Sequence, residues 1–356
     1  MEAASGLVPS VQEIAKEQLS QVPHRYVRPH HDRPIFTAAS PPHDLPQVPV
    51  IDMAKLLSQH HKESELQKLH YACKDWGFFQ LINHGVKTSL LESVKKGSED
   101  FFNQPVEEKK KRFGQLDGDV QGYGQAFVVS DEQKLDWADM FFMITLPHQI
   151  RKPHLFPNIP LPFRDYLEDY CGEMEKLAVQ ILELMADDLS IDPMEIREIL
   201  GEAEQSVRMN YYPPCPQPVL VIGLSSHSDG GGLTILVQAN EVEGLQIKKD
   251  GLWIPVKPLP NAFIINIGDM LEVITNGVYS SVEHRATVNS EKERLSIATF
   301  YNPAIDAIIG PAPSLVTPET PAAFKRIGAG EYFKGYLSQE LRGKSFLNSI
   351  RIPTGK

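Results

Sequence analysis

Two histidines and an aspartate in this 356-residue chain are spaced like a set of metal ligands. His227 and Asp229 stand two residues apart, and His284 follows much further along the chain. Two imidazoles and one carboxylate hold Fe(II) on one face and leave the opposite coordination positions open. Because side chains alternate along a strand, we expect His227 and Asp229 to project from one strand face. His284 should then come from a second strand folded back beside the first.

A candidate carboxylate site follows shortly after His284. Arg294 and Ser296 again stand two residues apart. A guanidinium beside a hydroxyl forms a fork that binds a carboxylate through parallel hydrogen bonds. The alternative is a surface ion pair between Arg294 and Glu291 or Glu293. The spacing from His284 favours the carboxylate site, so we expect both sites to share one strand-built cavity.

These five residues resemble the signature of the plant Fe(II)/2-oxoglutarate-dependent dioxygenases. Further stretches match the same family: residues 76–79 (Trp-Gly-Phe-Phe), 83–85 (Asn-His-Gly), 122–124 (Gly-Tyr-Gly), 134–137 (Lys-Leu-Asp-Trp) and 210–215 (Asn-Tyr-Tyr-Pro-Pro-Cys). The resemblance runs from about residue 10 to the C-terminus. It is nearest to the senescence-related and codeine O-demethylase-like branch of the family.

The resemblance implies an enzyme, a 2-oxoglutarate-dependent non-haem iron dioxygenase. His227, Asp229 and His284 are then catalytic ligands of Fe(II), with ascorbate as the reductant. The reaction would consume O₂ and 2-oxoglutarate and release succinate and CO₂. It would hydroxylate or O-demethylate a small apolar or aromatic plant metabolite or hormone. Two alternatives stay open, namely ring closure or desaturation with the same cofactors, and a non-catalytic jelly-roll binding protein.

The resemblance also assigns residues to the cosubstrate. The far carboxylate of 2-oxoglutarate is expected to meet Arg294 and Ser296. Tyr212 and Asn210, just upstream of the first metal ligand, are expected to add hydrogen bonds. A lysine in place of Arg294 would keep the charge but lose the bidentate geometry.

The resemblance also implies that four further residues line the substrate pocket. Phe300 lies four residues after Ser296 and therefore on the same strand face. Met140 and Phe142 alternate together on an upstream strand, although packing in the core would explain them equally well. Arg208 precedes the cosubstrate-binding asparagine by two residues and shares its face. Aromatic and apolar walls favour a flat organic molecule.

Two segments have open interpretations. Residues 230–232 are three glycines directly after Asp229, which either leave room for a large substrate or form a turn or bulge. Near the C-terminus, Tyr332, Phe333, Tyr336 and Leu337 either cover the cavity opening or simply pack in the core.

The surrounding elements predict an α+β fold. Helices are expected at residues 11–19, 64–75, 89–102, 105–111, 163–189, 193–200 and 322–341. Strands are expected at 48–52, 78–82, 127–130 and 140–146, and then from 206 to about 303, including 233–237, 244–247, 253–256 and 262–267. Strands of this kind, wound as two sheets, form a jelly roll. The resemblance implies the same core, a double-stranded β-helix with a helical N-terminal layer and a C-terminal helix.

The chain is expected to divide into four regions. These are an N-terminal extension (1–48), the helical region of the dioxygenase (49–200), the catalytic jelly-roll core (201–310) and a C-terminal helical segment (311–356). No flexible linker separates the helical region from the core, so we expect it to be a subdomain.

The composition limits the classes of binding partner and the cellular compartment that we expect. The formal net charge is −11, from 35 Lys+Arg and 46 Asp+Glu, without a basic stripe that would bind nucleic acid. The three cysteines are widely spaced and indicate a reducing compartment, not a disulfide framework. No signal peptide and no apolar run of roughly 18 residues is apparent. We therefore expect a cytoplasmic monomer that acts on a small molecule, without a membrane partner.

Overall fold

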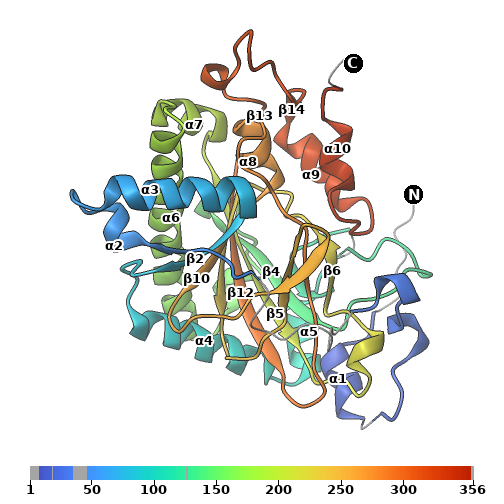
Figure 1. Ribbon diagram of the computed structural model, residues 1–356. Helices are drawn as coiled ribbons and strands as arrows, with labels where there is room; N and C mark the ends of the chain where they lie inside the picture. The colour runs from blue at the N-terminus through green and yellow to red at the C-terminus, as the bar shows by residue number, and fades with distance from the viewer. Residues whose placement is uncertain (1–7, 18, 35–45, 117, 126, 354–356) are drawn as a thin grey trace.

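The computed structural model describes residues 8–17, 19–34, 46–116, 118–125 and 127–353. Two β-sheets of eight and four strands form the centre of the molecule, and helices surround them (Figure 1). This is the α+β jelly-roll fold that the sequence predicts. The space between the two sheets holds the candidate site.

The large sheet is antiparallel except at one edge, where its first two strands run parallel. In spatial order it contains β1 (Val50–Asp52), β2 (Phe78–Ile82), β10 (Phe263–Ile267), β7 (Leu233–Gln238), β12 (Arg294–Asn302), β5 (Glu204–Tyr212), β4 (Asp139–Leu146) and β3 (Gly122–Gly124). The smaller sheet contains β6 (Leu224–His227), β11 (His284–Ala286), β8 (Leu245–Lys249) and β9 (Leu252–Pro255). A third, two-stranded sheet joins β13 (Ile308–Ile309) to β14 (Ile327–Gly328).

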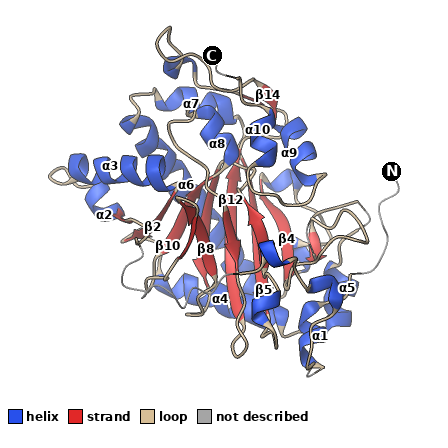
Figure 2. Ribbon diagram, turned by 45° about the vertical axis from the view of Figure 1, so that its right-hand side comes forward, coloured by secondary structure: helices blue, strands red, loops and turns tan. Residues whose placement is uncertain are grey.

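The helices group at the outside of the sheets. They are α1 (Val11–Lys16), α2 (Met53–Leu56), α3 (Lys62–Tyr71), α4 (Thr88–Phe102), α5 (Val106–Phe113), α6 (Phe163–Asp188), α7 (Pro193–Leu200), α8 (Asp269–Ile274), α9 (Ala329–Leu337) and α10 (Ser345–Ser349). Figure 1 shows α3, α6 and α7 together on one side. Figure 2 shows α8, α9 and α10 gathered at one end of the strands. The helices predicted at 89–102, 163–189 and 193–200 are confirmed within one residue at each end.

Alternation along β5 and β12 gives the large sheet two different faces. The strands pair antiparallel from Arg294 opposite Tyr212 to Asn302 opposite Glu204. Odd-numbered residues such as Val207 are buried in the main hydrophobic core, to which α4 and α6 contribute their apolar stripes. Even-numbered residues point to the other side, into the space between the sheets. One face of the sheet therefore stabilises the fold and the other is free to build a site.

The C-terminal region differs from the single helix predicted at residues 322–341. Strand β14 lies inside that range, and the helical residues are confined to α9 and, after a break, α10. Gly343 in the break has a φ of 58°, which a right-handed helix does not contain. Phe324 and Arg351 form an isolated antiparallel bridge. The segment thus folds back on itself, which helical periodicity alone does not reveal.

Three further differences from the prediction concern a strand and two helices. The strand predicted at 127–130 is wrong, because Phe127 has a φ of 59° and the segment is a loop. Helix α8 is absent from the prediction because it is short and all its residues are buried, so its two acidic residues, Asp269 and Glu272, do not mark a solvent-exposed face. The predicted N-terminal helix ends earlier, at Lys16, and residue 18 lies outside the described residues.

The proposed division into four regions stays a prediction. The helical region packs on the core, since α4 and α6 bury their apolar residues in the same cluster as the large sheet. Across the described part of the chain, none of the helices is both long and apolar enough to cross a bilayer.

A buried carboxylate fixes the N-terminal helix to the large sheet. Asp139 at the start of β4 accepts hydrogen bonds from Ser10 Oγ at 2.5 Å and from the backbone N–H groups of Val11 and Gln12 at 2.8 and 3.1 Å. The first N–H groups of a helix have no partner inside it, and the helix dipole favours a negative charge there. Asp139 therefore caps α1 from a distant strand.

Asp139→Ala is expected to lower the free energy of unfolding by about 2–3 kcal/mol, because it leaves the buried donors at the start of α1 without an acceptor. Urea denaturation measures the loss. Asp131→Ala, which removes an exposed aspartate from the preceding turn, is the control and should have little effect. Equal stability of the Asp139 variant and the wild type would show that other contacts hold α1.

Candidate active site

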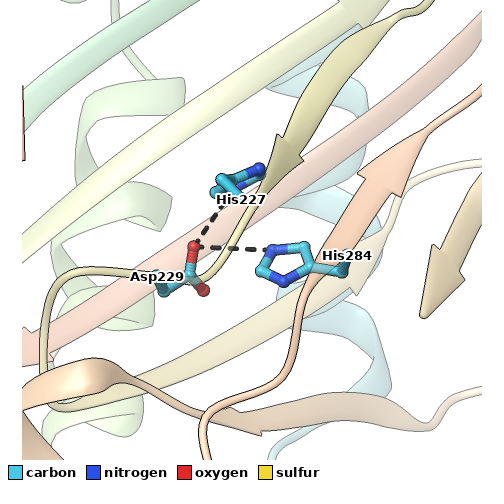
Figure 3. A group of neighbouring side chains, drawn as sticks. All are labelled: His227, Asp229 and His284. Atoms are coloured by element: carbon cyan, nitrogen blue, oxygen red, sulfur yellow. Dashed lines mark ion pairs between the residues drawn. The ribbon is translucent and has the colours of Figure 1, made fainter. Parts of the chain in front are cut away.

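His227, Asp229 and His284 meet between the two sheets (Figure 3). His227 ends β6, His284 begins β11, and the two strands pair with these histidines opposite each other. Nε2 of His227 lies 3.4 Å from Oδ1 of Asp229, and Nε2 of His284 lies 3.5 Å from the same oxygen. All three side chains are buried, and their candidate ligand atoms lie within 4.8 Å of one another. This geometry suits a single cation held by all three.

Asp229 does not lie on the strand that the sequence predicts for it. Strand β6 ends at His227, and Asp229 belongs to the loop that follows. The backbone N–H of Asp269, at the start of α8, donates to the carbonyl oxygen of Asp229 at 2.7 Å. The carboxylate therefore reaches the imidazoles because the loop turns at the strand end, not because the residues share a strand face.

The glycines after Asp229 are required by close packing of this loop. A Cβ on Gly231 would lie 1.9 Å from Oδ1 of Asn302, and one on Gly232 would lie 2.6 Å from the carbonyl oxygen of Tyr301. The turn interpretation of the three glycines is therefore favoured. Gly230 and Gly231 also border the cavity, so the missing side chains leave it open beside Asp229.

Backbone carbonyls orient the two imidazole rings. Nδ1 of His227 lies 2.7 Å from the carbonyl oxygen of Ser225, and Nδ1 of His284 lies 3.1 Å from that of Val282. Since a carbonyl only accepts, Nδ1–H donates in each ring and Nε2 points at Asp229. Nε2 is thus the ring nitrogen available to a metal ion.

The electrostatics of the cluster favour a cation. Burial alone would raise the pKa of Asp229, but the charge of His284 and hydrogen bonds from both imidazoles outweigh it and hold this pKa well below its usual range. Burial and the neighbouring His284 lower the pKa of His227. An ionised carboxylate and imidazole nitrogens that converge on one point are the donor set that a divalent metal ion requires.

The second oxygen of Asp229 is held by the large sheet. Thr234 Oγ1 and Asn266 Nδ2 each donate to Oδ2 of Asp229 at 2.7 Å. Thr234 on β7 and Asn266 on β10 pair directly in register, and both are buried. With Oδ2 engaged in these two bonds, Oδ1 is the oxygen that faces the histidines.

The buried guanidinium of Arg294 also lies between the two sheets, apart from His227, Asp229 and His284. Its side chain donates to Oε1 of Gln238 at 3.0 Å and to Oγ of Ser296 at 3.5 Å, whereas Nε has no partner in the described structure. The surface ion pair considered for Arg294 is wrong, since the residue is 3% exposed and Glu293 instead accepts from the hydroxyl of Tyr211. Burial lowers the pKa of Arg294. A buried guanidinium without a counter-charge is costly, so a ligand carboxylate fits here.

Tyr212 and Asn210 lie directly opposite Arg294 and Ser296 in the sheet, as their spacing predicts. The guanidinium carbon of Arg294 lies 5.1 Å from the centre of the Tyr212 ring. Oδ1 of Asn210 is buried without a hydrogen-bond partner in the described residues. The four side chains surround one polar space, and their contact with 2-oxoglutarate stays a prediction.

A cavity of about 390 Å³ extends from His227, Asp229 and His284, which we call the metal-ligand cluster, to the polar space beside Arg294. Every residue predicted for metal, cosubstrate or substrate lines it: His227, Asp229, His284, Arg294, Ser296, Tyr212, Asn210, Phe300, Met140, Phe142 and Arg208. From the C-terminal helix α9, Phe333, Tyr336 and Leu337 also line it, whereas the hydroxyl of Tyr332 is bonded to Asp269.

The four predicted substrate residues share the inner face of the large sheet. On β4, Phe142 lies opposite Arg208, and Met140 lies two residues before it on the same face. On β12, Phe300 lies opposite Ser206, the next residue after Arg208 on the inner face of β5 in the direction away from Met140. Met140 is only 2% exposed, so it is packed in the core and forms a wall as well. Nε of Arg208 is buried without a partner in the described chain.

Three residues of this site are missed by sequence reasoning, namely Thr234, Gln238 and Asn266. The sequence indicates Tyr336 only as a cover of the opening or as core, and its hydroxyl donates to the carbonyl oxygen of Ser228 at 2.8 Å. Asn266 offers a signal, because it is a polar residue inside the apolar run of β10. Thr234 and Gln238 follow the period of two on β7, but nothing in the sequence shows which face of that strand is inside.

Thr234→Val is expected to weaken the affinity for Co(II), a spectroscopic substitute for a native divalent ion, by about tenfold, because the isosteric methyl group cannot hold Oδ2 of Asp229. Thr234→Ser keeps the hydroxyl and should retain most of the affinity. Anaerobic titration followed by the visible absorption of Co(II) reports both affinity and ligand geometry. Equal affinities of the three proteins would assign Thr234 to packing alone.

Two family models match separate parts of the chain. Residues 203–303 match the 2OG-Fe(II) oxygenase superfamily. Residues 48–159 match a model described as non-haem dioxygenase in morphine synthesis N-terminal. The first match spans β5 to β12 and so contains the metal-ligand cluster and Arg294.

Named relatives cover nearly the whole chain. Oxoglutarate-dependent flavonoid 7-O-demethylase 1 of Ocimum basilicum is 59% identical over 97% of this chain and 91% of the relative. Codeine O-demethylase of Papaver somniferum is 52% identical over 97% of this chain and 96% of the relative. A crystal structure of JOX2 in complex with 2OG, Fe and JA superimposes with a TM-score of 0.88 at 35% identity, covering 98% of this chain and 99% of that one. The chain therefore belongs to the 2OG-Fe(II) oxygenase superfamily and is a 2-oxoglutarate-dependent non-haem iron dioxygenase.

Proposed function

We propose that the enzyme removes a methyl group from a flat aromatic methyl ether, with Fe(II) on His227, Asp229 and His284. The observation that carries this proposal is the position of the three ligands on an apolar, aromatic-walled cavity. The kinship with O-demethylases supports the same reaction. The donor set of two imidazoles and one oriented carboxylate is the one that non-haem Fe(II) oxygenases use.

When bound, Fe(II) and 2-oxoglutarate activate O₂ and oxidise a C–H bond of the substrate, with succinate and CO₂ as coproducts. In an aryl methyl ether the oxidised carbon is the methyl carbon. The resulting hemiacetal separates into a phenol and formaldehyde. The protein contributes the position of the methyl group and a water-poor cavity around it.

Arg294 and its neighbours would hold the cosubstrate. The guanidinium would neutralise the far carboxylate of 2-oxoglutarate, and Ser296 would donate a hydrogen bond beside it. Tyr212 and Asn210, opposite them on β5, would add contacts from the second strand. This arrangement supplies the missing counter-charge of Arg294 and would orient the cosubstrate toward the metal ligands.

The substrate would lie against Phe300, Met140 and Phe142. Aromatic rings stack on flat ligands in an offset or edge-to-face arrangement, and a cavity of a few hundred Å³ suits a drug-sized molecule. Phe333 and Leu337 of α9 would form part of the opposite wall. The two alternatives for α9, a cover over the cavity opening and packing in the core, both stay open.

The guanidinium of Arg208 supports a second candidate function, the hydroxylation of a small carboxylic acid. Its side chain lines the cavity, and no hydrogen bond of the guanidinium is formed in the described structure. A substrate carboxylate would provide the acceptor. The same guanidinium also suits a carbonyl or phenolic oxygen of a flat methyl ether, which agrees with the first candidate.

The test is an anaerobic preparation with Fe(II) and 2-oxoglutarate, exposed to O₂ with aryl methyl ethers and with small carboxylic acids. The proposed function predicts formaldehyde, succinate and a product lighter by one CH₂ unit from the ethers. Products heavier by one oxygen atom, formed from the acids alone, would select the second candidate. Succinate release that no compound stimulates would contradict both.

Arg294→Lys is expected to raise the apparent KM for 2-oxoglutarate by roughly tenfold or more, because one charge-assisted bond contributes about 1.5–3 kcal/mol. The KM for the organic substrate should change much less. Arg285→Lys is the matched control, because Arg285 also lines the cavity but its guanidinium is engaged elsewhere: it donates to Gln246 and stacks 4.0 Å from the Trp253 ring centre. An unchanged 2-oxoglutarate dependence would remove Arg294 from the cosubstrate site.

Phe300→Ala is expected to weaken binding of the aromatic substrate by about 1–3 kcal/mol and leave 2-oxoglutarate affinity nearly intact, because only the stacking surface is lost. Calorimetry with each ligand separates the two affinities, and thermal unfolding reports on packing. If both affinities and thermal stability fall together, Phe300 belongs to the core and the substrate lies elsewhere.

We also propose that the enzyme works as a monomer in the cytosol. The described residues of one chain supply the candidate metal ligands together with the residues proposed for 2-oxoglutarate and the substrate, which suits a monomer. The three cysteines are buried and unpaired, which suits a reducing compartment.

A further inference from the structure

Residues on the inner face of β5 and β12 line the cavity along its whole length. We call each pair of opposite residues on this face a row. Arg294 and Tyr212 form the first row, and Asn302 and Glu204 form the last. Thr234, which holds Asp229, pairs with Phe300 in the row before the last. The metal-ligand cluster therefore lies next to that row, and the last row lies beyond it, on the side away from Arg294.

Glu204 lies in the last row, at the end of the cavity remote from Arg294. The side chain lines the cavity and is partly buried, and the described residues provide it with neither a hydrogen bond nor an ion pair. Burial raises its pKa, with no neighbouring charge to offset it. A carboxylate that has lost water without gaining a donor is a place where a ligand donor binds favourably.

Two amides at the same end supply donors. Oδ1 of Asn302 accepts from the backbone N–H of Gly232 at 3.1 Å, and Oε1 of Gln121 accepts from that of Ile144 at 3.0 Å. Ile144 pairs with Ser206, one row from Glu204. The backbone thus fixes both amide oxygens, and the NH₂ groups of Asn302 and Gln121 have no acceptor in the described structure. Both residues line the cavity.

We propose that Glu204, Asn302 and Gln121 form a hydroxyl-binding subsite that selects substrates with a free hydroxyl at the end remote from 2-oxoglutarate. This inference rests on the proposed function, since it names a second feature of the same aromatic methyl ether. A hydroxyl donates one hydrogen bond to Glu204 and accepts one from an amide. An ammonium group only donates, and a methoxy group only accepts, so each would leave part of the subsite unmatched.

The position of the subsite also orients the ligand. One row corresponds to two residues, or about 7 Å along the strand. A ring system anchored by its hydroxyl at Glu204 would extend back past Phe300 toward the metal ligands. Glu204 would therefore decide which methoxy group of a polymethoxylated molecule reaches the iron.

The test uses the full chain with Fe(II) and 2-oxoglutarate under anaerobic conditions, so that binding is measured without turnover. The probes are two flat aryl methyl ethers that differ only in a hydroxyl or a hydrogen at the end remote from the methoxy group. Calorimetry gives the Kd of each probe for the wild type, Glu204→Gln, Glu204→Ala and Glu202→Ala. Glu202 is exposed and two residues away, so its variant controls for the change of charge.

The subsite predicts that the wild type binds the hydroxylated probe about tenfold more tightly than its partner, as expected for a hydrogen bond to a charged group. Glu204→Ala should abolish this preference without changing the Kd of the probe that lacks the hydroxyl. Glu204→Gln, which keeps an acceptor oxygen, should retain part of the preference, and Glu202→Ala all of it.

Other outcomes overturn the inference in distinguishable ways. If the wild type binds both probes equally, or if Glu204→Ala weakens both equally, the subsite is wrong while the proposed function stands. If an aminomethyl analogue of the probe binds more tightly than the hydroxylated one, the subsite selects a cation and the hydroxyl assignment is wrong. If neither probe binds the wild type, the proposed substrate class fails and the subsite fails with it.

Discussion

The ionised carboxylate of Asp229 is the constraint on which the rest of the site depends. A buried carboxylate is stable only when donors or cations surround it. Thr234 and Asn266 of the large sheet satisfy one oxygen, and His227 and His284 of the smaller sheet face the other. The carboxylate thereby connects the two sheets at the point where a metal ion would bind.

The C-terminal segment stabilises this cluster from outside. Tyr336 bonds the carbonyl oxygen of Ser228, and the backbone of Gly343 pairs with Ser226 and Ser228 on both sides of His227. Lys344 forms a partly buried ion pair with Glu272 of α8, at 2.6 Å. Residues near the end of the chain thus hold the strand that carries His227, the first candidate metal ligand.

The fold and the meeting of the two candidate histidine ligands could be predicted from sequence because they follow short-range rules. His227, His284, Arg294 and Ser296 lie where spacing and strand alternation place them. Asp229 shows the limit of that argument, since it reaches the site through a turn whose close packing only the folded chain reveals. The C-terminal region was harder to predict, because its periodicity suggests a single helix, whereas Gly343 and the bridge between Phe324 and Arg351 interrupt the segment. The hydrogen-bond donors to Asp229, Thr234 and Asn266, come together only because β7 and β10 are neighbours in the sheet. A local sequence pattern does not reveal which strands pair.

The central claim is that Asp229 is a metal ligand and not merely a buried structural acid. Anaerobic calorimetry with Fe(II) on the wild type and on Asp229→Ala tests it most directly, with thermal unfolding measured on the same samples. The account predicts one Fe(II) ion per chain for the wild type and at least a tenfold loss of affinity for a variant that remains folded. A folded Asp229→Ala protein that binds Fe(II) as tightly as the wild type would contradict the account.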